Sequence, residues 1–169
     1  MKKLFFLVAF VAAIFDSRAQ PSSTDRITYT VNDPGFNTTE QEVTVLTQSV
    51  ANDSYYSLAG GVVLAKPTFP SFNFTRPADI NSKSFNLAIY QATKIPSIEF
   101  KIYAEGAAEP YVSYQLKNVS LVGFKINGAA GGSPFLENIS LTFENWGFKD
   151  WVNNLSFGYN TLNATLTSY

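Results

Sequence analysis

The stretch that most constrains the fold is Asp79–Tyr103, where the spacing of apolar residues changes from helical to extended. Four apolar residues follow helical spacing, at i, i+3, i+4 and i+7: Phe85, Ala88, Ile89 and Ala92. Residues at this spacing lie on one face of a helix. Asp79, Asn81 and Ser82 offer oxygens for the free N–H groups of a first turn. The pattern predicts a short helix over about residues 82–93.

The same stretch then predicts a strand. Pro96 disfavours helical backbone at the preceding residue, so we expect the helix to end near Thr93. Ile98, Phe100 and Ile102 alternate with polar or amphipathic residues, as in a half-buried strand. A lone helix followed by a strand indicates a helix that packs at the flank of a sheet or barrel.

Period-two alternation recurs along the rest of the chain. The predicted strands are residues 27–31, 42–50, 55–64, 71–76, 111–116, 118–126 and 138–144, with one or two short strands within 151–169. Gly60 and Gly61 predict a bulge or bend in the third of these, and Asn52–Ser54 before it is loop-like. Trp146 and Phe148 are apolar on the opposite parity from 138–144, which predicts a bulge or a strand covered on both faces. The chain is therefore expected to be mainly β, an antiparallel barrel or sandwich of about eight to ten strands with one flanking helix.

Composition excludes several functions. The 169 residues contain no Cys and no His, which removes thiol catalysis, thiolate metal sites and the commonest general base. The net charge is −1 and no run of basic residues occurs, so we expect no nucleic-acid partner. Neither a cofactor nor a metal is expected, and the sequence predicts no enzymatic activity. Hydrolysis by paired carboxylates, such as Glu105 with Glu109 or Glu137 with Glu144, ranks well below the other functions considered.

Residues 1–19 have the pattern of a secretory signal. Lys2 and Lys3 precede the apolar run Leu4–Phe15, which is too short to span a bilayer. Ser17-Arg18-Ala19 has the small-x-small form of a cleavage site, so we expect cleavage between Ala19 and Gln20. The alternative is an N-terminal membrane anchor. We expect a secreted protein without stable membrane insertion, formed by a single domain over residues 20–169.

Asn-x-Ser/Thr sequons are numerous. They begin at seven positions: Asn37, Asn52, Asn73, Asn118, Asn138, Asn154 and Asn163. In a host that glycosylates secreted proteins, several of these would be modified surface sites. The alternative is that these polar residues simply face solvent, and the sequence leaves both interpretations open.

The segment from about Phe69 to Trp151 resembles the haemolysin-coregulated protein (Hcp) family, the tube subunits of type VI secretion. The similar features occur in order: FTRPAD (74–79), the helix SKSFNLAIYQATK (82–94), IEFKIY (98–103), YVSYQLKNVSLVGFKI (111–126) and PFLENISLTFENWGF (134–148). Leu116-Lys-Asn-Val119 matches the centre of the fourth feature. Ile27–Phe36 echoes the family's opening strand only loosely, and family members normally lack a signal peptide. The resemblance implies an Hcp-like barrel of two packed sheets with a divergent N-terminal part and a C-terminal extension.

The resemblance also implies self-association into hexameric rings that stack into tubes or filaments. By analogy, the loops Glu105–Pro110 and Asn127–Pro134 would make subunit contacts, with Glu105, Glu109, Asn127 and Pro134 as candidates. Trp146 and Trp151 are further candidates, because aromatic residues near a strand-poor end suit an interface. For these aromatic residues the alternative is core packing. The alternative function is a monomeric secreted binding module that uses exposed aromatic residues to bind carbohydrate.

Overall fold

The computed structural model describes residues 24–56, 62–128 and 134–169. The expected signal segment 1–19 and the bulge expected at Gly60-Gly61 lie outside the described residues, as does most of the loop 127–134. In the described part the elements are β1 (Arg26–Asn32), β2 (Gln41–Val43), β3 (Val45–Gln48), β4 (Ala51–Tyr56), β5 (Val62–Thr68), β6 (Phe72–Pro77), α2 (Ser82–Gln91), β7 (Ile95–Tyr103), β8 (Val112–Asn127), β9 (Leu136–Thr142), β10 (Asn145–Asp150), β11 (Leu155–Asn160) and β12 (Thr165–Thr167). These twelve strands exceed the eight to ten that the alternation predicts.

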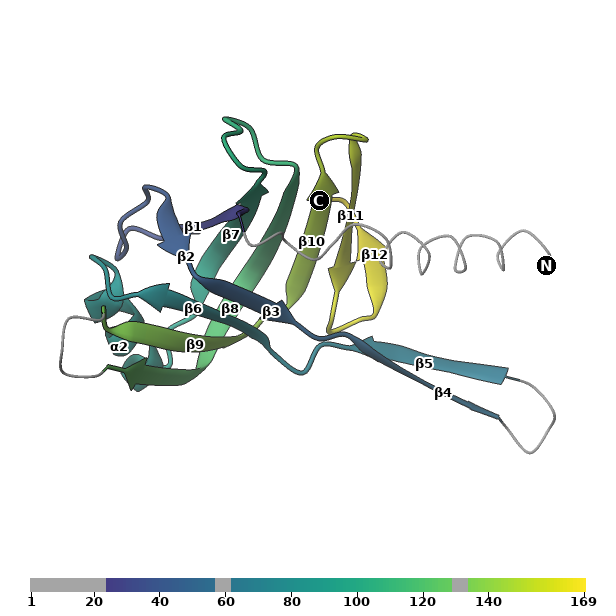
Figure 1. Ribbon diagram of the computed structural model, residues 1–169. Coiled ribbons are helices and arrows are strands. Elements are labelled where there is room, and N and C mark those ends of the chain that lie inside the picture. Colours follow the sequence, from purple (N-terminus) through teal and green to yellow (C-terminus); the bar gives the residue numbers. More distant parts are fainter. Residues whose placement is uncertain (1–23, 57–61, 129–133) are drawn as a thin grey trace.

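The strands form two layers that share β8. The large sheet has the order β12-β11-β10-β8-β7-β1-β2, and the small sheet pairs β8 with β9, β9 with β6 and β6 with β3. Every one of these pairings is antiparallel. The ladder does not close into a barrel, so the architecture is sandwich-like (Figure 1). The predicted fold class, mainly antiparallel β with one short helix, is confirmed.

The long strand β8 joins the layers by bending. Its first half pairs with β7 and β10 in the large sheet, and its second half pairs with β9 in the small sheet. Asn118 lies at the change and has φ of 52°, a left-handed conformation that Asn adopts more readily than most residues. A register shift between Leu121 and Gly123 follows. Asn118 thus allows β8 to bend and to take part in both sheets.

The core lies between the two layers. The inward residues of β7, Ile98 and Phe100, are fully buried, as the alternation predicts. From the small sheet, Phe72 and Phe74 approach Phe100 with ring centroids 4.8 and 5.1 Å apart. Each fully buried apolar side chain of this size contributes roughly 1.5–3 kcal/mol relative to exposure. This aromatic core is what a domain without disulfides relies on.

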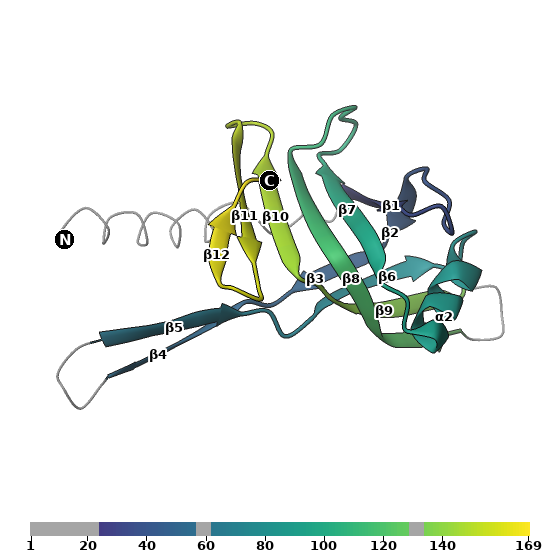
Figure 2. The same cartoon turned by 180° about the vertical axis from the view of Figure 1, so that it is seen from behind.

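Helix α2 covers one end of the sandwich, as Figure 2 shows from behind. Its buried residues are Phe85 and Ala88, and the Phe85 ring lies 4.9 Å from Phe36 and 6.0 Å from Phe74. The helix ends at Gln91, two residues before the predicted end, because Ala92 adopts a left-handed conformation. The Thr93 N–H then bonds to the carbonyl of Ala88, which closes the helix end.

The start of α2 uses the expected residues in a different way. Asn81 is the N-cap, but its side chain makes no capping bond and instead accepts the N–H of Asn37 at 2.7 Å. Asp79 Oδ1 accepts the N–H of Asn81 at 2.7 Å, and Ser82 Oγ accepts the N–H of Asp79 at 3.0 Å. These bonds order the turn before the helix and tie it to the loop after β1.

The prediction for residues 52–64 is wrong in part. Asn52–Ser54, expected to be a loop, lies in β4, and β4 and β5 form a two-stranded hairpin separate from the main sheets. Figures 1 and 2 both show this hairpin, which we call the arm, projecting away from the sandwich. The polar composition of 52–54 suggested a loop, but main-chain pairing in a hairpin does not require alternating apolar residues.

The apolar residues change from odd to even positions between 138–144 and Trp146, for a reason that the sequence did not suggest. It does not come from a bulge within a single strand. Instead β9 ends at Thr142 in the small sheet, and β10 begins at Asn145 in the large sheet. Ile139, Leu141 and Trp146 are all buried because the core lies between those two layers.

Candidate functional site

A buried charged cluster lies where α2 meets the small sheet. Arg76 is completely buried, and its Nη2 lies 2.6 Å from Glu137 Oε2. The other guanidinium nitrogen, Nη1, donates to the hydroxyl of Tyr29 at 2.6 Å and pairs with Asp79. Nη2 also approaches Ser82 Oγ at 3.3 Å. Sequence reasoning placed Glu137 only as a strand-flanking carboxylate and did not single out Arg76, because its partner lies 61 residues away.

The Arg76–Glu137 pair at the centre of this cluster is shielded from solvent, whereas Asp79 at its edge is 18% exposed. Burial raises the pKa of Tyr29 well above its ordinary value, although the Arg76 cation and the Asn81 hydrogen bond act in the opposite direction. The phenol therefore stays protonated and donates to Asp79 Oδ2 at 2.8 Å. The Glu137 carboxylate is almost fully buried and is engaged by Arg76.

The loop residues predicted to contact other subunits lie at opposite ends of β8. Glu105 and Glu109 are exposed in the loop that precedes β8, where Gly106 has φ of 72°. Asn127 ends β8 and is half-buried, and Pro134 is exposed just before β9. The structure thus places the two groups at the two ends of one 16-residue strand and does not bring them together.

The two tryptophans lie in different environments. Trp146 is 5% exposed and packs among aromatic rings, with Phe157 at 5.3 Å and Phe69 at 6.0 Å between ring centroids. Trp151 is 43% exposed, but Lys149 Nζ lies 3.3 Å from its ring centroid and covers one face. The chain therefore does not present these two rings together as a platform for a sugar.

The seven sequons fall into distinct settings. Asn154 and Asn163 are exposed in the turns that flank β11. Asn118 is exposed at the bend of β8 and donates to Glu144 Oε2 at 2.8 Å. Asn37, Asn73 and Asn138 are half-buried, and Asn52 lies in β4. Among the six sequons whose exposure the structure describes, the two in turns and the one at the bend are thus the exposed ones.

Among the other described carboxylates, Glu144 is paired with its neighbours. Glu144 bonds to Lys94 and Asn118, and these bonds, the one from Lys94 above all, lower its pKa. Within residues 24–56, 62–128 and 134–169, no three acidic side chains are placed to share a metal ion. In that same part of the chain, no helix is long and apolar enough to cross a membrane.

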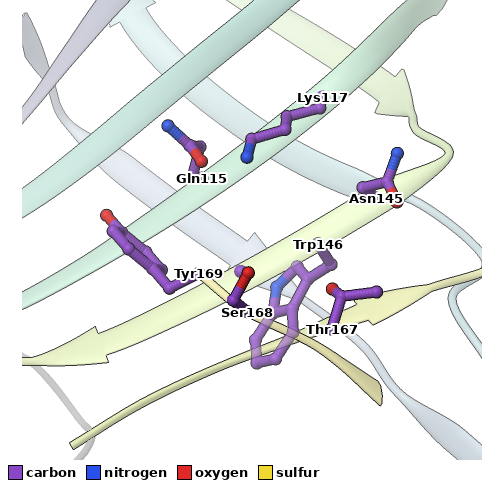
Figure 3. Close-up of a pocket in the computed structure, with 8 residues that line it drawn as sticks. Gln115, Lys117, Asn145, Trp146, Thr167, Ser168 and Tyr169 are labelled. Atoms are coloured by element: carbon purple, nitrogen blue, oxygen red, sulfur yellow. The ribbon is translucent and has the colours of Figure 1, made fainter. Parts of the chain in front are cut away.

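A pocket of about 270 Å³ opens on the outer face of the large sheet (Figure 3). Its walls are formed by Gln115, Lys117, Asn145, Trp146, Gly147, Thr167, Ser168 and Tyr169. Figure 3 shows Gln115 and Lys117 on β8, with Tyr169 and Ser168 beside them. The chain's last residues line this pocket, so we call residues 165–169 the tail.

Tyr169 lies against the outer face of the large sheet and is bonded there. Its hydroxyl is 2.6 Å from Ser113 Oγ and donates to Glu99 Oε1 at 3.1 Å. Burial and the nearby Glu99 carboxylate raise the pKa of Tyr169 to about 12, against the opposing effect of the Ser113 bond. Local alternation gives no signal for this contact, because it joins residues 56 and 70 positions apart.

The chain is similar to known proteins both in sequence pattern and in fold. A protein-family model described as "Type VI secretion system effector, Hcp" matches residues 33–149, more than half of the chain. No curated protein sequence matches. Among solved structures, a type six secretion system protein is 16% identical, with 84% of this chain and 99% of that chain covered and a TM-score of 0.71.

Two named Hcp structures are also similar. Hcp1 from Salmonella typhimurium is 15% identical, with 85% of this chain and 99% of that chain covered and a TM-score of 0.68. Hcp3 from Pseudomonas aeruginosa, titled a secreted protein, is 15% identical, with 80% and 98% covered and a TM-score of 0.60. At such identities the structural likeness concerns the fold, and the family model carries the assignment. The chain belongs to the Hcp family of type VI secretion system proteins.

Proposed function

We propose that this protein is a secreted, non-enzymatic structural subunit that associates with copies of itself into hexameric rings, which stack head to tail into tubes or filaments. The observation that carries the proposal is the arm formed by β4 and β5. Its strands pair only with each other and leave the main sheets unextended. An isolated two-stranded hairpin is marginally stable in water, so a projecting one is best explained by a surface on another subunit.

The placement of the two contact loops supports head-to-tail stacking. Glu105 and Glu109 lie before β8, and Asn127 and Pro134 lie after its other end. Contacts between two different surfaces of identical subunits are heterologous, and they form closed rings or open filaments. Loops at opposite ends of the longest strand suit the two faces of such a stack.

The proposal includes secretion with a cleaved signal segment. Cleavage between Ala19 and Gln20 would release a chain of residues 20–169. In a host that attaches glycans to Asn, Asn154 and Asn163 are the sequons best exposed for modification. The intact mass of the protein purified from its own host reads out both events at once.

Native mass spectrometry of that purified protein tests the assembly. The expected result is a species at six times the protomer mass, with a ladder of multiples where rings stack. A second protein in which a short Gly-Ser turn replaces residues 52–67 should keep the fold and lose the rings, because it lacks the arm.

A charge reversal separates ring formation from stacking. Replacing Glu105 and Glu109 by Lys should shorten the ladder and leave the single ring intact. The control is Lys83→Glu, a charge reversal at an exposed position of α2, outside the Glu105–Pro110 loop. Monomers alone at high micromolar concentration, in the unaltered protein, would overturn the proposal and favour a monomeric binding module.

A further inference from the structure

Two facing glycines form the floor beneath the tail. Gly147 on β10 is paired directly with Gly158 on β11. A Cβ at Gly147 would lie 3.0 Å from Tyr169 Cδ2, and one at Gly158 would lie 2.5 Å from Thr167 Oγ1. Both distances are too short for real side-chain contacts without movement. The absence of side chains at these two neighbouring positions therefore makes a slot with the shape of residues 167–169.

Polar groups at the end of the slot select an aromatic hydroxyl. Trp151 Nε1 donates to Ser113 Oγ at 3.1 Å, which leaves the Ser113 hydroxyl to donate to Tyr169. Tyr169 in turn donates to Glu99 Oε1. The hydroxyls of Ser113 and Tyr169 thus each accept one hydrogen bond and donate another. A connected network of this kind favours a ligand that has a hydroxyl at this position. Ser113 is fully buried. Without Tyr169 in the slot, its hydroxyl would lose the hydrogen bond to the phenol, which is unfavourable for a buried polar group.

The rest of the tail is exposed to solvent, although it pairs with β11, from Gly158 with Thr167 to Asn160 with Thr165. Strand β12 has only three residues, all of them exposed, and Leu166 is 74% exposed. The short turn that connects it to β11 contains Ala164 with φ of 58°, a conformation that is unfavourable for Ala. Short, strained connections favour exchange of a terminal element between copies of a protein. Tyr169 thus makes the side-chain hydrogen bonds of the tail to the outer face of the sheet, and the turn that joins the tail to β11 contains one strained residue.

We propose that this slot is a peptide-binding site that accepts, in trans, the tail of a second copy of the chain. The ligand is an extended segment that carries a tyrosine, which is the chemistry that the slot holds in this structure. In dilute solution the tethered tail has the advantage, whereas in an assembly a neighbouring tail also reaches a roughly millimolar effective concentration. The inference rests on the proposed function only in naming a second copy as the source of the tail.

Two complementary full-length variants test the exchange. Tyr169→Ala keeps the slot but loses the residue that fills it, and Gly147→Val keeps the tail but closes the slot. Mixed together, one offers a slot without its tyrosine and the other a tail that its own slot no longer accommodates. Native mass spectrometry below the ring-forming concentration should then show a 1:1 heterodimer that neither variant forms alone. Circular dichroism of each variant checks that it folds.

A peptide measurement keeps the test valid if Gly147→Val does not fold. A labelled peptide of sequence Thr-Leu-Thr-Ser-Tyr should bind the Tyr169→Ala protein about tenfold or more tighter than the unaltered protein, whose tethered tail competes. The same peptide ending in Ala should not bind. Equal binding of the two peptides, or neither peptide binding nor heterodimer, would overturn the inference. Rings formed by the unaltered protein in that case would leave the proposed function standing.

Discussion

Arg76 Nη2 lies 2.6 Å from Glu137 Oε2, and the two side chains are 0% and 3% exposed. The residues are direct partners on β6 and β9, so the ion pair spans two neighbouring strands of the small sheet. Arg76 also pairs with Asp79, which precedes α2. One guanidinium thus fixes the start of the helix to the small sheet.

Replacing Arg76 by Met should destabilise the protein strongly. The change leaves Glu137 buried without its cation, and breaking a buried pair in this way costs about 3–5 kcal/mol. Urea unfolding measures the loss. The matched control is Lys94→Met, which removes the exposed partner of Glu144 and should cost little stability, because solvent screens this pair. Equal losses for the two variants would contradict the role of burial. The double change Arg76→Met with Glu137→Met should recover part of the stability.

The spacing of apolar residues correctly predicted which faces of the helix and strands are buried. Phe85 and Ala88 mark the buried face of α2, and Ile139 and Leu141 mark the buried face of β9, because burial on one side repeats with the period of each element. The sheet change after Thr142 was not predictable in this way, since it depends on which layer the chain joins next. The burial of Arg76 and the docking of Tyr169 were missed for the same reason: their partners lie 47 to 70 residues away.

Asn118 allows a prediction about the bend of β8. A β-branched residue does not tolerate φ of 52°, so Asn118→Val should destabilise the protein by roughly 1–2 kcal/mol. Asn118→Gly removes the same bond to Glu144 but accepts the backbone conformation, and it should cost clearly less. Thermal unfolding of the two variants compares them directly. If Gly is as harmful as Val, the lost hydrogen bond, and not the backbone conformation, determines the effect.

Phe85 should be the most sensitive position of α2. It is fully buried among Tyr29, Phe36 and Phe74, so Phe85→Ala leaves a cavity in the core. Such truncations cost about 3–5 kcal/mol. Leu87→Ala, on the exposed side of the same helix, should change the free energy of unfolding by no more than about 0.5 kcal/mol. Chemical denaturation of both variants tests the assignment of the two helix faces, and a similar cost at the two positions would contradict it.

Tyr169 should make stability fall at high pH. Its pKa is raised to about 12 in the folded chain from an ordinary value of 10.0, chiefly by burial. Between these two values the unfolded chain has lost the phenolic proton while the folded chain keeps it. The folded state then binds more protons, so the free energy of unfolding decreases as the pH rises. Below pH 10 both states are protonated and the contribution of the docked phenol is fully present.

Comparison with Tyr169→Phe isolates this effect. Tyr29, Tyr103, Tyr111 and Tyr114 also have raised pKa values, but they are present in both proteins and their contributions cancel in the difference. We expect the unaltered protein to be the more stable at neutral pH, because Phe cannot bond to Ser113 and Glu99. That advantage should shrink as the pH rises from 10 towards 12. Urea unfolding of both proteins across this range measures the difference. An advantage that stays constant with pH would mean that the Tyr169 phenol ionises equally in the folded and unfolded chains, and that its burial in the slot does not hold the proton.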